Sequence, residues 1–460
     1  MKIKTLLLST LALSAVSVSA QAQTFIEITG ATAFRQGATA TINAIFAAGG
    51  NFISVHNGGM LGGNVQSWRG TFGSLGSNVT VRTRWNGSTE GLRAVAQPNQ
   101  TVDGLPTNPG FLNTSILDGL SPVAGGNQLG VNTGSQNSVN TTAAVADMSF
   151  SDCRLEATPI PGTLAGGPVG VVTFTMVANK TWRDDARTAA ITSVCSQQFR
   201  TLFSQGRVRL SYFTGNESDA EFVYASGRND GSGTRTTYLA ETGYGASNAV
   251  NQYVGYDRSN TTVLHSIVLV PKDGGFLANG TATATNRSSL WSQNVDGNGG
   301  YVSGGDLRVD FAKTTANTKV YTFFDDEEDG NITADDAVEL YPAAKVFLLS
   351  WLSTADAAVA RGDNNLGAAN ACILGYEGVR LDDLAATGNA TLTAADRLKV
   401  TSGRYNGWSN QQLLYVAGNT TLTTAFNTIS GNISANIGSA GIPTTSMSVG
   451  RVIDGGIINR

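Results

Sequence analysis

The sequence predicts an α/β fold built from parallel sheets and divided between two or more domains. The chain has 460 residues, which is more than one hydrophobic core usually holds. Short apolar strands, small polar loops and helical stretches follow one another along it, an order typical of α/β units. Val169–Ala178 is an unbroken apolar-rich run, as expected for a strand that is covered on both faces.

The first part of the chain contains three expected strands. Phe25–Thr29 is a short apolar-rich strand, and residues 34–46 carry apolar side chains at helical spacing. Val79–Arg84 alternates like a strand and precedes a second helical stretch. Residues 98–140 are rich in Asn, Gly and Pro, so we expect an irregular segment there. Thr142–Met148 is the third strand.

The second part contains the clearest helix of the sequence, Thr181–Gly206. Its apolar residues form one stripe, and a glycine ends it. Strands are expected at Val208–Phe213 and Phe222–Ala225. The loop Gly227–Gly231 then leads into a helix over residues 232–242.

Residues 1–23 have the features of a secretory signal peptide. Lys2 and Lys4 precede a short apolar stretch, and Ala20–Ala22 (AQA) fits a cleavage site. A short buried helix is the alternative. The stretch is too short to span a membrane, and no cysteine near the junction offers a lipid anchor. We therefore expect an exported, periplasmic protein.

Composition excludes several classes of function. The formal charge is −4, and without a cluster of Lys and Arg an acidic chain is a poor nucleic-acid binder. Three cysteines, Cys153, Cys195 and Cys372, allow at most one disulfide and have no metal-site spacing. Two histidines, His56 and His265, are few for histidine-based catalysis or metal binding.

Three short segments share one design, in which a strand is followed by a small polar loop and a helix start. They are Gly30–Ala33 (GATA), Asn86–Thr89 (NGST) and Gly231–Thr234 (GSGT). A helix start offers free amide N–H groups and a positive dipole end, which together attract anions. Each segment alone is more typical of an ordinary helix cap. Arg228, just before the third loop, offers a planar fork suited to an oxyanion and shifts the interpretation toward an anion site.

The stretch Arg228–Thr234 (RNDGSGT) resembles the loop motif of the periplasmic phosphate-binding proteins of ABC transporters. Ile28–Phe34 (ITGATAF), Asn86–Gly91 (NGSTEG) and Ala146–Asp152 (ADMSFSD) are similar to other segments of that family, in the same order. So are Ile373–Gly378 and Ser402–Tyr415, although the latter lacks the family's proline. The resemblance implies that the ligand is held by Thr32, Ala33, Ser88, Asp152, Arg228, Ser232, Gly233 and Thr234.

The resemblance also implies a two-lobed, Venus-flytrap α/β fold with two crossover strands. Lobe one would comprise residues 24–177 and 406–460. Lobe two would comprise residues 178–405, with an insertion near 306–370. Such a monomer closes around phosphate or a similar oxyanion and delivers it to an inner-membrane ABC permease.

Asp152 has a chemical rationale within that site. A carboxylate beside an oxyanion is favourable only if the ligand still carries a proton to donate. Phosphate carries one at neutral pH and sulfate does not, so this acceptor would select phosphate. A helix cap is the alternative role for Asp152, and Asp147 is expected to be a structural residue at a strand end.

A second motif, Asp325–Asp336 (DDEEDGNITADD), matches the pattern of a calcium loop. The expected ligands are Asp325, Glu327, Asp329, Asn331 and Asp336. Position three is Glu and position twelve is the shorter Asp, so a solvated acidic loop is the alternative. Apart from this possible calcium ion, no cofactor is expected.

Enzyme signatures are absent from the sequence. There is no Walker loop, no G-x-S-x-G, no H-E-x-x-H and no dinucleotide fingerprint. The sequence therefore favours an exported phosphate-binding protein that is not an enzyme. An exported surface or structural protein with the same fold is the alternative, and a phosphate-releasing hydrolase is a weaker one.

Overall fold

The computed structural model describes the chain over residues 23–102, 105–131, 140–257, 260–270, 291–292, 299–323, 337–362, 371–381, 392–438 and 441–459. The expected signal peptide, apart from Gln23, and the acidic loop at 325–336 lie outside these ranges. Among the helices of the described residues, none combines the length and the apolar composition that crossing a bilayer requires.

Within the described residues, the largest sheet joins thirteen strands and passes through both halves of the molecule. Eleven of them form one path, which runs in the order β13 (Arg207–Arg209), β14 (Phe222–Ala225), β21 (Phe347–Ser353), β11 (Ala165–Ala178), β23 (Trp408–Tyr415), β10 (Met148–Ser151), β1 (Thr24–Gly30), β4 (Val79–Arg84), β3 (Val65–Gly70), β2 (Ile53–His56) and β8 (Leu129–Gly130). Strand β22 (Cys372–Tyr376) pairs with β11 and with β12 (Ser193–Val194).

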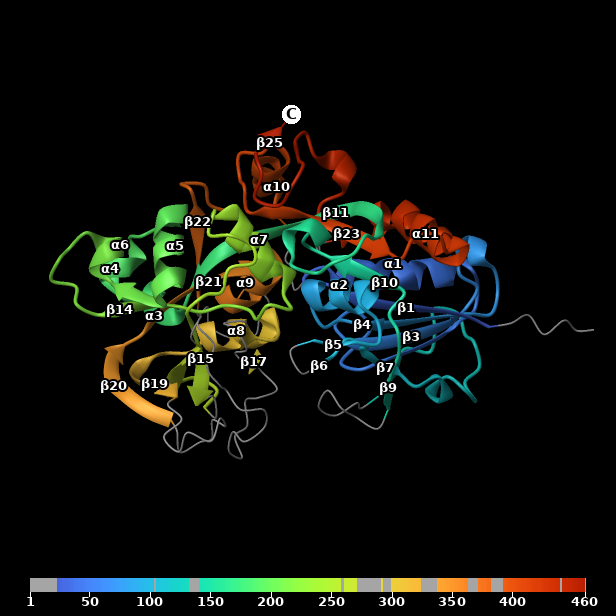
Figure 1. Ribbon diagram of the computed structural model, residues 1–460, viewed down its shortest axis with the longest axis horizontal. Helices are drawn as coiled ribbons and strands as arrows, with labels where there is room; N and C mark the ends of the chain where they lie inside the picture. The colour runs from blue at the N-terminus through green and yellow to red at the C-terminus, as the bar shows by residue number, and fades with distance from the viewer. Residues whose placement is uncertain are drawn as a thin grey trace, which may run out of the picture.

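Strands β11 and β23 connect the two halves. Strand β11 pairs with β23 as far as Thr173, and from Phe174 onward it pairs with β21. Figure 1 shows these two strands passing between a half that carries β1, β3 and β4 and a half that carries β14 and β21. The α/β fold with two lobes and two crossover strands that the sequence predicts is therefore confirmed.

Each lobe has its own hydrophobic core. In one, α1 (Arg35–Ala48) and α11 (Thr420–Asn436) lie together over the sheet and bury Phe46, Phe150 and Ile429. In the other, α5 (Ser196–Gln205), α7 (Gly233–Glu241) and α9 (Thr354–Arg361) pack around Phe199, Tyr238 and Trp351. Strand β11 contributes Val169 to the first core and Val171 to the second, so a single strand joins them.

Three further sets of elements lie beside these cores or the largest sheet. A four-stranded sheet consists of β15 (Gln252–Asp257), β16 (Ser266–Val270), β19 (Ala316–Phe323) and β20 (Ala337–Lys345). Helix α8 (Gly304–Phe311) lies against α9. Helix α2 (Ser88–Ala96) packs beside β1 and β10. Of the expected insertion near 306–370, β19 and β20 lie in this separate sheet and β21 lies in the largest sheet, and all three contribute residues to the second core, as does α9.

The continuous helix predicted over Thr181–Gly206 is wrong. The segment forms α3 (Lys180–Asp184), α4 (Ala186–Ala189), the short strand β12 and then α5. Asp185 interrupts it in an extended conformation (φ −90°, ψ 124°), and its carboxylate pairs with Arg187 and Lys345. The Asp185 side chain also accepts from Arg187 N–H as the N-cap of α4, so a helix cap interrupts the segment although the apolar periodicity continues.

Two strand predictions also need correction. The segment expected as a strand at Val208–Phe213 forms β13 and then α6 (Ser211–Thr214), whose residue Phe213 packs edge-on against Trp182. The segment Thr142–Met148 divides between β9 (Thr141–Ala143) and β10. All three cysteines are free thiols in the structure.

Candidate functional site

The loops singled out in the sequence follow the carboxyl ends of parallel strands. Strands β10, β1 and β4 are adjacent and parallel, so the segments that follow Gly30, Arg84 and Ser151 emerge at one edge of the sheet. In the other lobe, β14 and β21 are also parallel and place the segments after Ala225 and Ser353 together. Open α/β sheets typically bind ligands at such an edge.

The carboxylate of Asp152 lies where the two lobes touch. It accepts a hydrogen bond from the Ser88 hydroxyl, and Asp152 N–H donates to Ser88 Oγ at 3.2 Å. The Thr234 hydroxyl of the other lobe donates to the second carboxylate oxygen at 3.4 Å. Asp152 is only 2% exposed. The structure therefore brings these three expected site residues into direct contact.

Close packing at this contact depends on two glycines. A Cβ atom on Gly233 would lie 1.7 Å from Asp152 Oδ1 and 2.6 Å from Ser88 Cβ. A Cβ atom on Gly87, whose φ is +123°, would lie 2.3 Å from the Gly231 carbonyl oxygen. No larger residue fits at either position without displacing the opposite lobe.

The backbone carbonyl of Asp152 is held by hydroxyl groups from two further elements. Thr237 Oγ1 on α7 donates to it at 3.0 Å, and Ser409 Oγ on β23 donates to it at 2.5 Å. The sequence reasoning did not identify either residue as part of the site. Ser409 lies within the segment that resembles the family's late stretch, which was the one available signal.

The first amide groups of α2 are already paired across the lobe contact. The N–H groups of Thr89 and Glu90 donate to the Gly231 carbonyl at 3.1 and 3.3 Å. The first-turn N–H groups of a helix have no partner within the helix. A carbonyl from the opposite lobe therefore occupies the position in which a helix start would present its amides to an anion.

Arg228 is a buried cation in this region, with 2% of its surface exposed. Its Nε donates to the Tyr301 carbonyl at 3.0 Å and its Nη2 to the Val302 carbonyl at 2.7 Å. Burial lowers the pKa of Arg228, and the carboxylates of Asp356 and Asp152 act in the opposite direction. The guanidinium is thus positioned by the backbone and lies within electrostatic reach of Asp152.

Burial raises the pKa of the Asp152 carboxyl above its ordinary value. The hydrogen bond from Ser88 and the charge of Arg228 lower the same pKa and oppose this effect. Because removal from water penalises a charged form, both groups would gain from a ligand that supplies an anion to Arg228 and a proton to Asp152.

The remaining expected residues lie close by but in different roles. Ser232 is the N-cap of α7, and its hydroxyl accepts from Arg235 N–H at 3.4 Å. Thr32 and Ala33 lie in the turn between β1 and α1, where both are partly buried. Ala33 packs against the core of the other lobe. A hydrogen bond from Gly87 N–H to the Gly30 carbonyl, at 3.0 Å, ties this turn to the start of α2.

Sequence reasoning missed a second charged group at the same edge. Arg35 is the first residue of α1, and burial lowers its pKa while Asp356 of the other lobe raises it. Asp356 also forms an ion pair with Arg308 at 2.8 Å. The signal for Arg35 was its place directly after the ITGATAF segment, at a helix start.

The calcium prediction falls outside the described residues. Asp325, Glu327, Asp329, Asn331 and Asp336 belong to residues 324–336, so their role as metal ligands stays a prediction. Within the described parts of the chain, His, Cys, Asp and Glu side chains form no group of three or more that could hold a metal ion.

Comparisons with known proteins found similarity only among solved structures. No protein-family model matches the chain, and no curated protein matches it significantly. The structure of an ABC-type phosphate transport receptor from Vibrio cholerae is similar over 90% of this chain and 98% of its own, with 9% identity and a TM-score of 0.37. PstS from Borrelia burgdorferi is similar over 92% of this chain and 100% of its own, with 9% identity and a TM-score of 0.33.

Proposed function

We propose that the protein is an exported binding protein, rather than an enzyme, that captures phosphate or a similar protonated oxyanion between its lobes. The observation that carries the proposal is that a buried arginine, Arg228, and a buried acid, Asp152, influence each other electrostatically where helix starts of both lobes meet. Monohydrogen phosphate requires a site that excludes water and contains both a hydrogen-bonding cation and a proton acceptor.

Each group has a defined task in this proposal. Arg228 neutralises the oxyanion with a guanidinium that the Tyr301 and Val302 carbonyls hold in place. Ser88 and Thr234 turn their hydroxyl groups from Asp152 to the ligand. Asp152 then accepts the ligand's proton. Because the site excludes water when the lobes close, each of these hydrogen bonds is strengthened.

Ligand entry requires the lobes to separate. In the structure the amides of Thr89 and Glu90 are bonded to Gly231 of the other lobe, so the anion must replace that carbonyl. Rotation about the crossover strands β11 and β23 is the simplest motion that breaks this contact while leaving both cores intact. The closed form, as a monomer, then binds an ABC permease as its partner.

Calorimetric titration with phosphate tests the proposal. Wild-type protein should bind phosphate. Arg228→Ala should bind it at least about a hundredfold more weakly, because removing one partner of a buried charged pair costs roughly 3–5 kcal/mol. Arg228→Lys keeps the charge without the planar fork and should fall between the two. Phosphate binding that survives Arg228→Ala unchanged, in a folded variant, would remove Arg228 from the site.

A second candidate function has its own support. The hydrogen bonds from Thr89 and Glu90 to Gly231 join the lobes directly, as a purely structural protein would require. A wild-type protein that binds neither phosphate, arsenate nor sulfate would favour an exported structural protein with this fold.

A further inference from the structure

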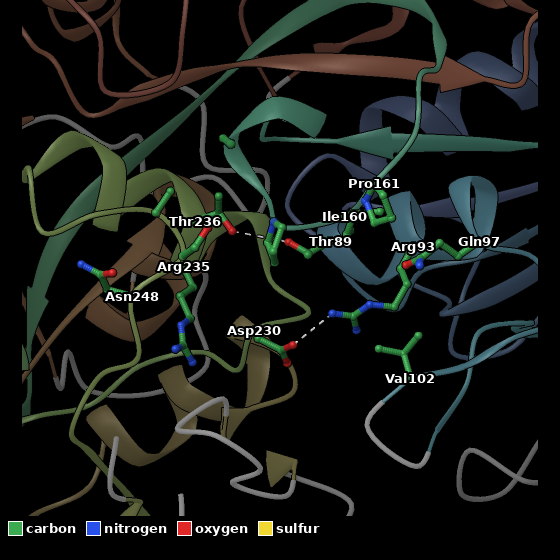
Figure 2. Close-up of a pocket in the computed structure, with 14 residues that line it drawn as sticks. Thr89, Arg93, Gln97, Val102, Ile160, Pro161, Asp230, Arg235, Thr236 and Asn248 are labelled. Atoms are coloured by element: carbon green, nitrogen blue, oxygen red, sulfur yellow. Dashed lines mark hydrogen bonds and ion pairs between the residues drawn. The ribbon is translucent and has the colours of Figure 1, made fainter. Parts of the chain in front are cut away.

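Polar contacts join the lobes on the side of the cleft. Thr89 Oγ1 and Thr236 Oγ1 lie 3.4 Å apart, and Arg93 pairs with Asp230 at 3.3 Å. Figure 2 shows both contacts, which join α2 to the region where α7 begins. A cavity of about 270 Å³, lined in part by Arg93 and Arg235, lies beside them. Because this cavity interrupts the packing, contacts outside the cleft also contribute to the position of α7.

The carboxyl-terminal segment brings a second set of contacts to α7. After α11, residues 441–459 pack on the other lobe, where Ile442 and Val449 belong to the second core. Strands β24 (Gly450–Arg451) and β25 (Ile458–Asn459) pair as an antiparallel hairpin, and we call residues 450–459 the terminal hairpin. Figure 1 shows β25 near the middle of the molecule, above the crossover strands β11 and β23 in this view.

Arg451 fastens the terminal hairpin to the end of α7. Its Nη1 lies 2.6 Å from Glu241 Oε2, and the two side chains are 1% and 8% exposed. Glu241 is the last residue of α7, the helix whose first turn contacts Asp152. The Arg451 guanidinium also donates to the Asn406 carbonyl at 3.0 Å and lies 4.3 Å from the centre of the Trp408 ring. Because both charges are buried, losing one partner leaves the other charge uncompensated, so this attachment resists disruption.

Asp454 fastens the same hairpin to the loop that carries Asp152. Its Oδ2 accepts from the N–H of Arg154, two residues after Asp152, at 2.6 Å. Its Oδ1 lies 3.4 Å from Ser409 Oγ, the hydroxyl that donates to the Asp152 carbonyl. Asp454 is buried, so water competes little for these contacts. The short stretch 451–454 therefore reaches both α7 and the loop after β10.

The turn of the terminal hairpin packs directly on α7. Gly455 has a φ of +68°, and a Cβ atom there would lie 2.3 Å from the Ala240 carbonyl oxygen. Ala240 directly precedes Glu241, the partner of Arg451. A larger residue at position 455 would therefore strain the backbone and push the hairpin away from the helix.

We infer that Arg451 and Asp454 are positioning residues that hold α7 and the Asp152 loop in the closed arrangement. This role rests on the proposed function, since it prepares the same site for phosphate. Arg451 fixes the last turn of α7, while Thr234 in its first turn contacts Asp152. Asp454 fixes the loop itself. Without these contacts a smaller fraction of the molecules is closed, and the apparent affinity for phosphate falls in proportion.

Arg451→Ala tests the inference by two measurements. Small-angle X-ray scattering of the unliganded variant should give a larger radius of gyration than wild type, because α7 is released from the hairpin. Calorimetric titration should give about tenfold weaker phosphate binding, the result expected when the closed fraction falls to about a tenth. Saturating phosphate should return the radius of gyration to the wild-type value, since the ligand favours the closed arrangement. Arg451→Lys keeps the charge beside Glu241 and should recover most of the affinity.

Val452→Ser is the matched control, because Val452 lies in the same hairpin and is 73% exposed. It should leave the radius of gyration and the phosphate affinity unchanged. Should Arg451→Ala fail to fold, Gly455→Ala disturbs the same contact and should change both quantities in the same directions.

An unchanged radius of gyration in a folded variant, with or without a loss of affinity or stability, would overturn the inference and leave Arg451 as a structural residue. Absence of phosphate binding by the wild type would instead refute the proposed function. In that case the scattering of the unliganded proteins still decides whether the terminal hairpin holds the lobes together.

Discussion

The contact between the lobes has a centre and a rim, and the two are built differently. At the centre, Asp152 is 2% exposed and meets Ser88 and Thr234 through hydroxyl groups, with Gly233 packed against its carboxylate. At the rim, Arg93 and Asp230 form an ion pair at 3.3 Å, with side chains 12% and 25% exposed. The contact at the centre thus depends on close packing and hydrogen bonds, whereas the contact at the rim depends on an ion pair.

Burial explains why the two parts should respond differently to mutation. A buried polar group that loses its partner costs its full desolvation, about 1–3 kcal/mol. A partly exposed ion pair is screened by water, and such pairs contribute about 0–1 kcal/mol. Changes at the centre should therefore exceed changes at the rim in both stability and phosphate affinity.

Among the variants that compare the centre with the rim, the largest loss of unfolding free energy is expected at Gly233. Gly233→Ala places a methyl group 1.7 Å from Asp152 Oδ1, so the lobes must move apart. Overpacking of this kind costs about 1–3 kcal/mol of unfolding free energy. Phosphate binding should weaken in parallel, and denaturant unfolding and calorimetry measure the two effects.

Gly431 provides the matched control. It lies inside helix α11, is exposed, and an added Cβ would meet no atom within 4 Å. Gly431→Ala should stabilise the protein by about 0.5–1 kcal/mol, because alanine loses less backbone entropy in a helix. Equal stability of the two variants would show that the lobes do not need close contact at Gly233.

The next effect concerns the charge of Asp152. Asp152→Asn keeps the shape, removes the negative charge and adds an N–H donor. Sulfate should then gain affinity relative to phosphate by about tenfold, the size of one hydrogen bond to a charged group. Titration of both anions into both proteins measures the ratio. Equal affinity of the wild-type protein for sulfate and phosphate would show that Asp152 does not select phosphate over sulfate.

The same residue predicts a pH dependence. Burial raises the pKa of Asp152 above 3.8, so the folded protein holds a proton at this group where the unfolded chain has released it. The unfolding free energy of unliganded wild type should therefore rise relative to Asp152→Asn as pH falls through the folded pKa toward 3.8. Asp454, whose pKa burial also raises, contributes to the raised pKa of Asp152, so the two acids titrate as a coupled pair and the difference between the proteins reports both. A difference in unfolding free energy between the two proteins that does not change with pH would show that Asp152 is solvated.

The smallest effect is expected at the rim. Arg93→Gln and Asp230→Asn should each lower the unfolding free energy by about 0.2–1 kcal/mol, because the pair is partly exposed and its shortest distance is 3.3 Å. A double-mutant cycle isolates the pair from the second bond of Arg93 to Glu90. A coupling well above 1 kcal/mol would mean that the rim, and not the centre, holds the lobes together.

Segments with strong local signals were predicted well. Strands β1 and β4, helices α1 and α7, and the loop that precedes α7 follow from apolar spacing and from glycine and serine positions. The small polar loops contain Ser88 and Thr234, and the resemblance to the phosphate-binding proteins added Asp152; the structure places the three in contact. Their role as ligands of an anion stays a prediction, as do the lobe boundaries and the calcium loop.

Features that depend on distant partners could not be predicted. The helix expected over Thr181–Gly206 breaks at Asp185, whose carboxylate caps α4 and pairs with Lys345, 160 positions along the chain. The hydrogen bond from Ser409 to the Asp152 carbonyl joins residues 257 positions apart. Local propensity contains no information about either pairing, since both form only when the strands assemble.

The sequence by itself therefore determined the α/β class, the order of the main strands and the small residues at the helix starts, because these follow from local backbone preferences. Only the tertiary structure decided what those helix starts bind. It placed the Gly231 carbonyl on the amides of α2 and the charges of Arg93 and Arg235 around one cavity. The physical reason is desolvation. A donor that is removed from water needs a hydrogen-bond partner, and the packing of the two lobes decides whether that partner is a protein carbonyl or a ligand.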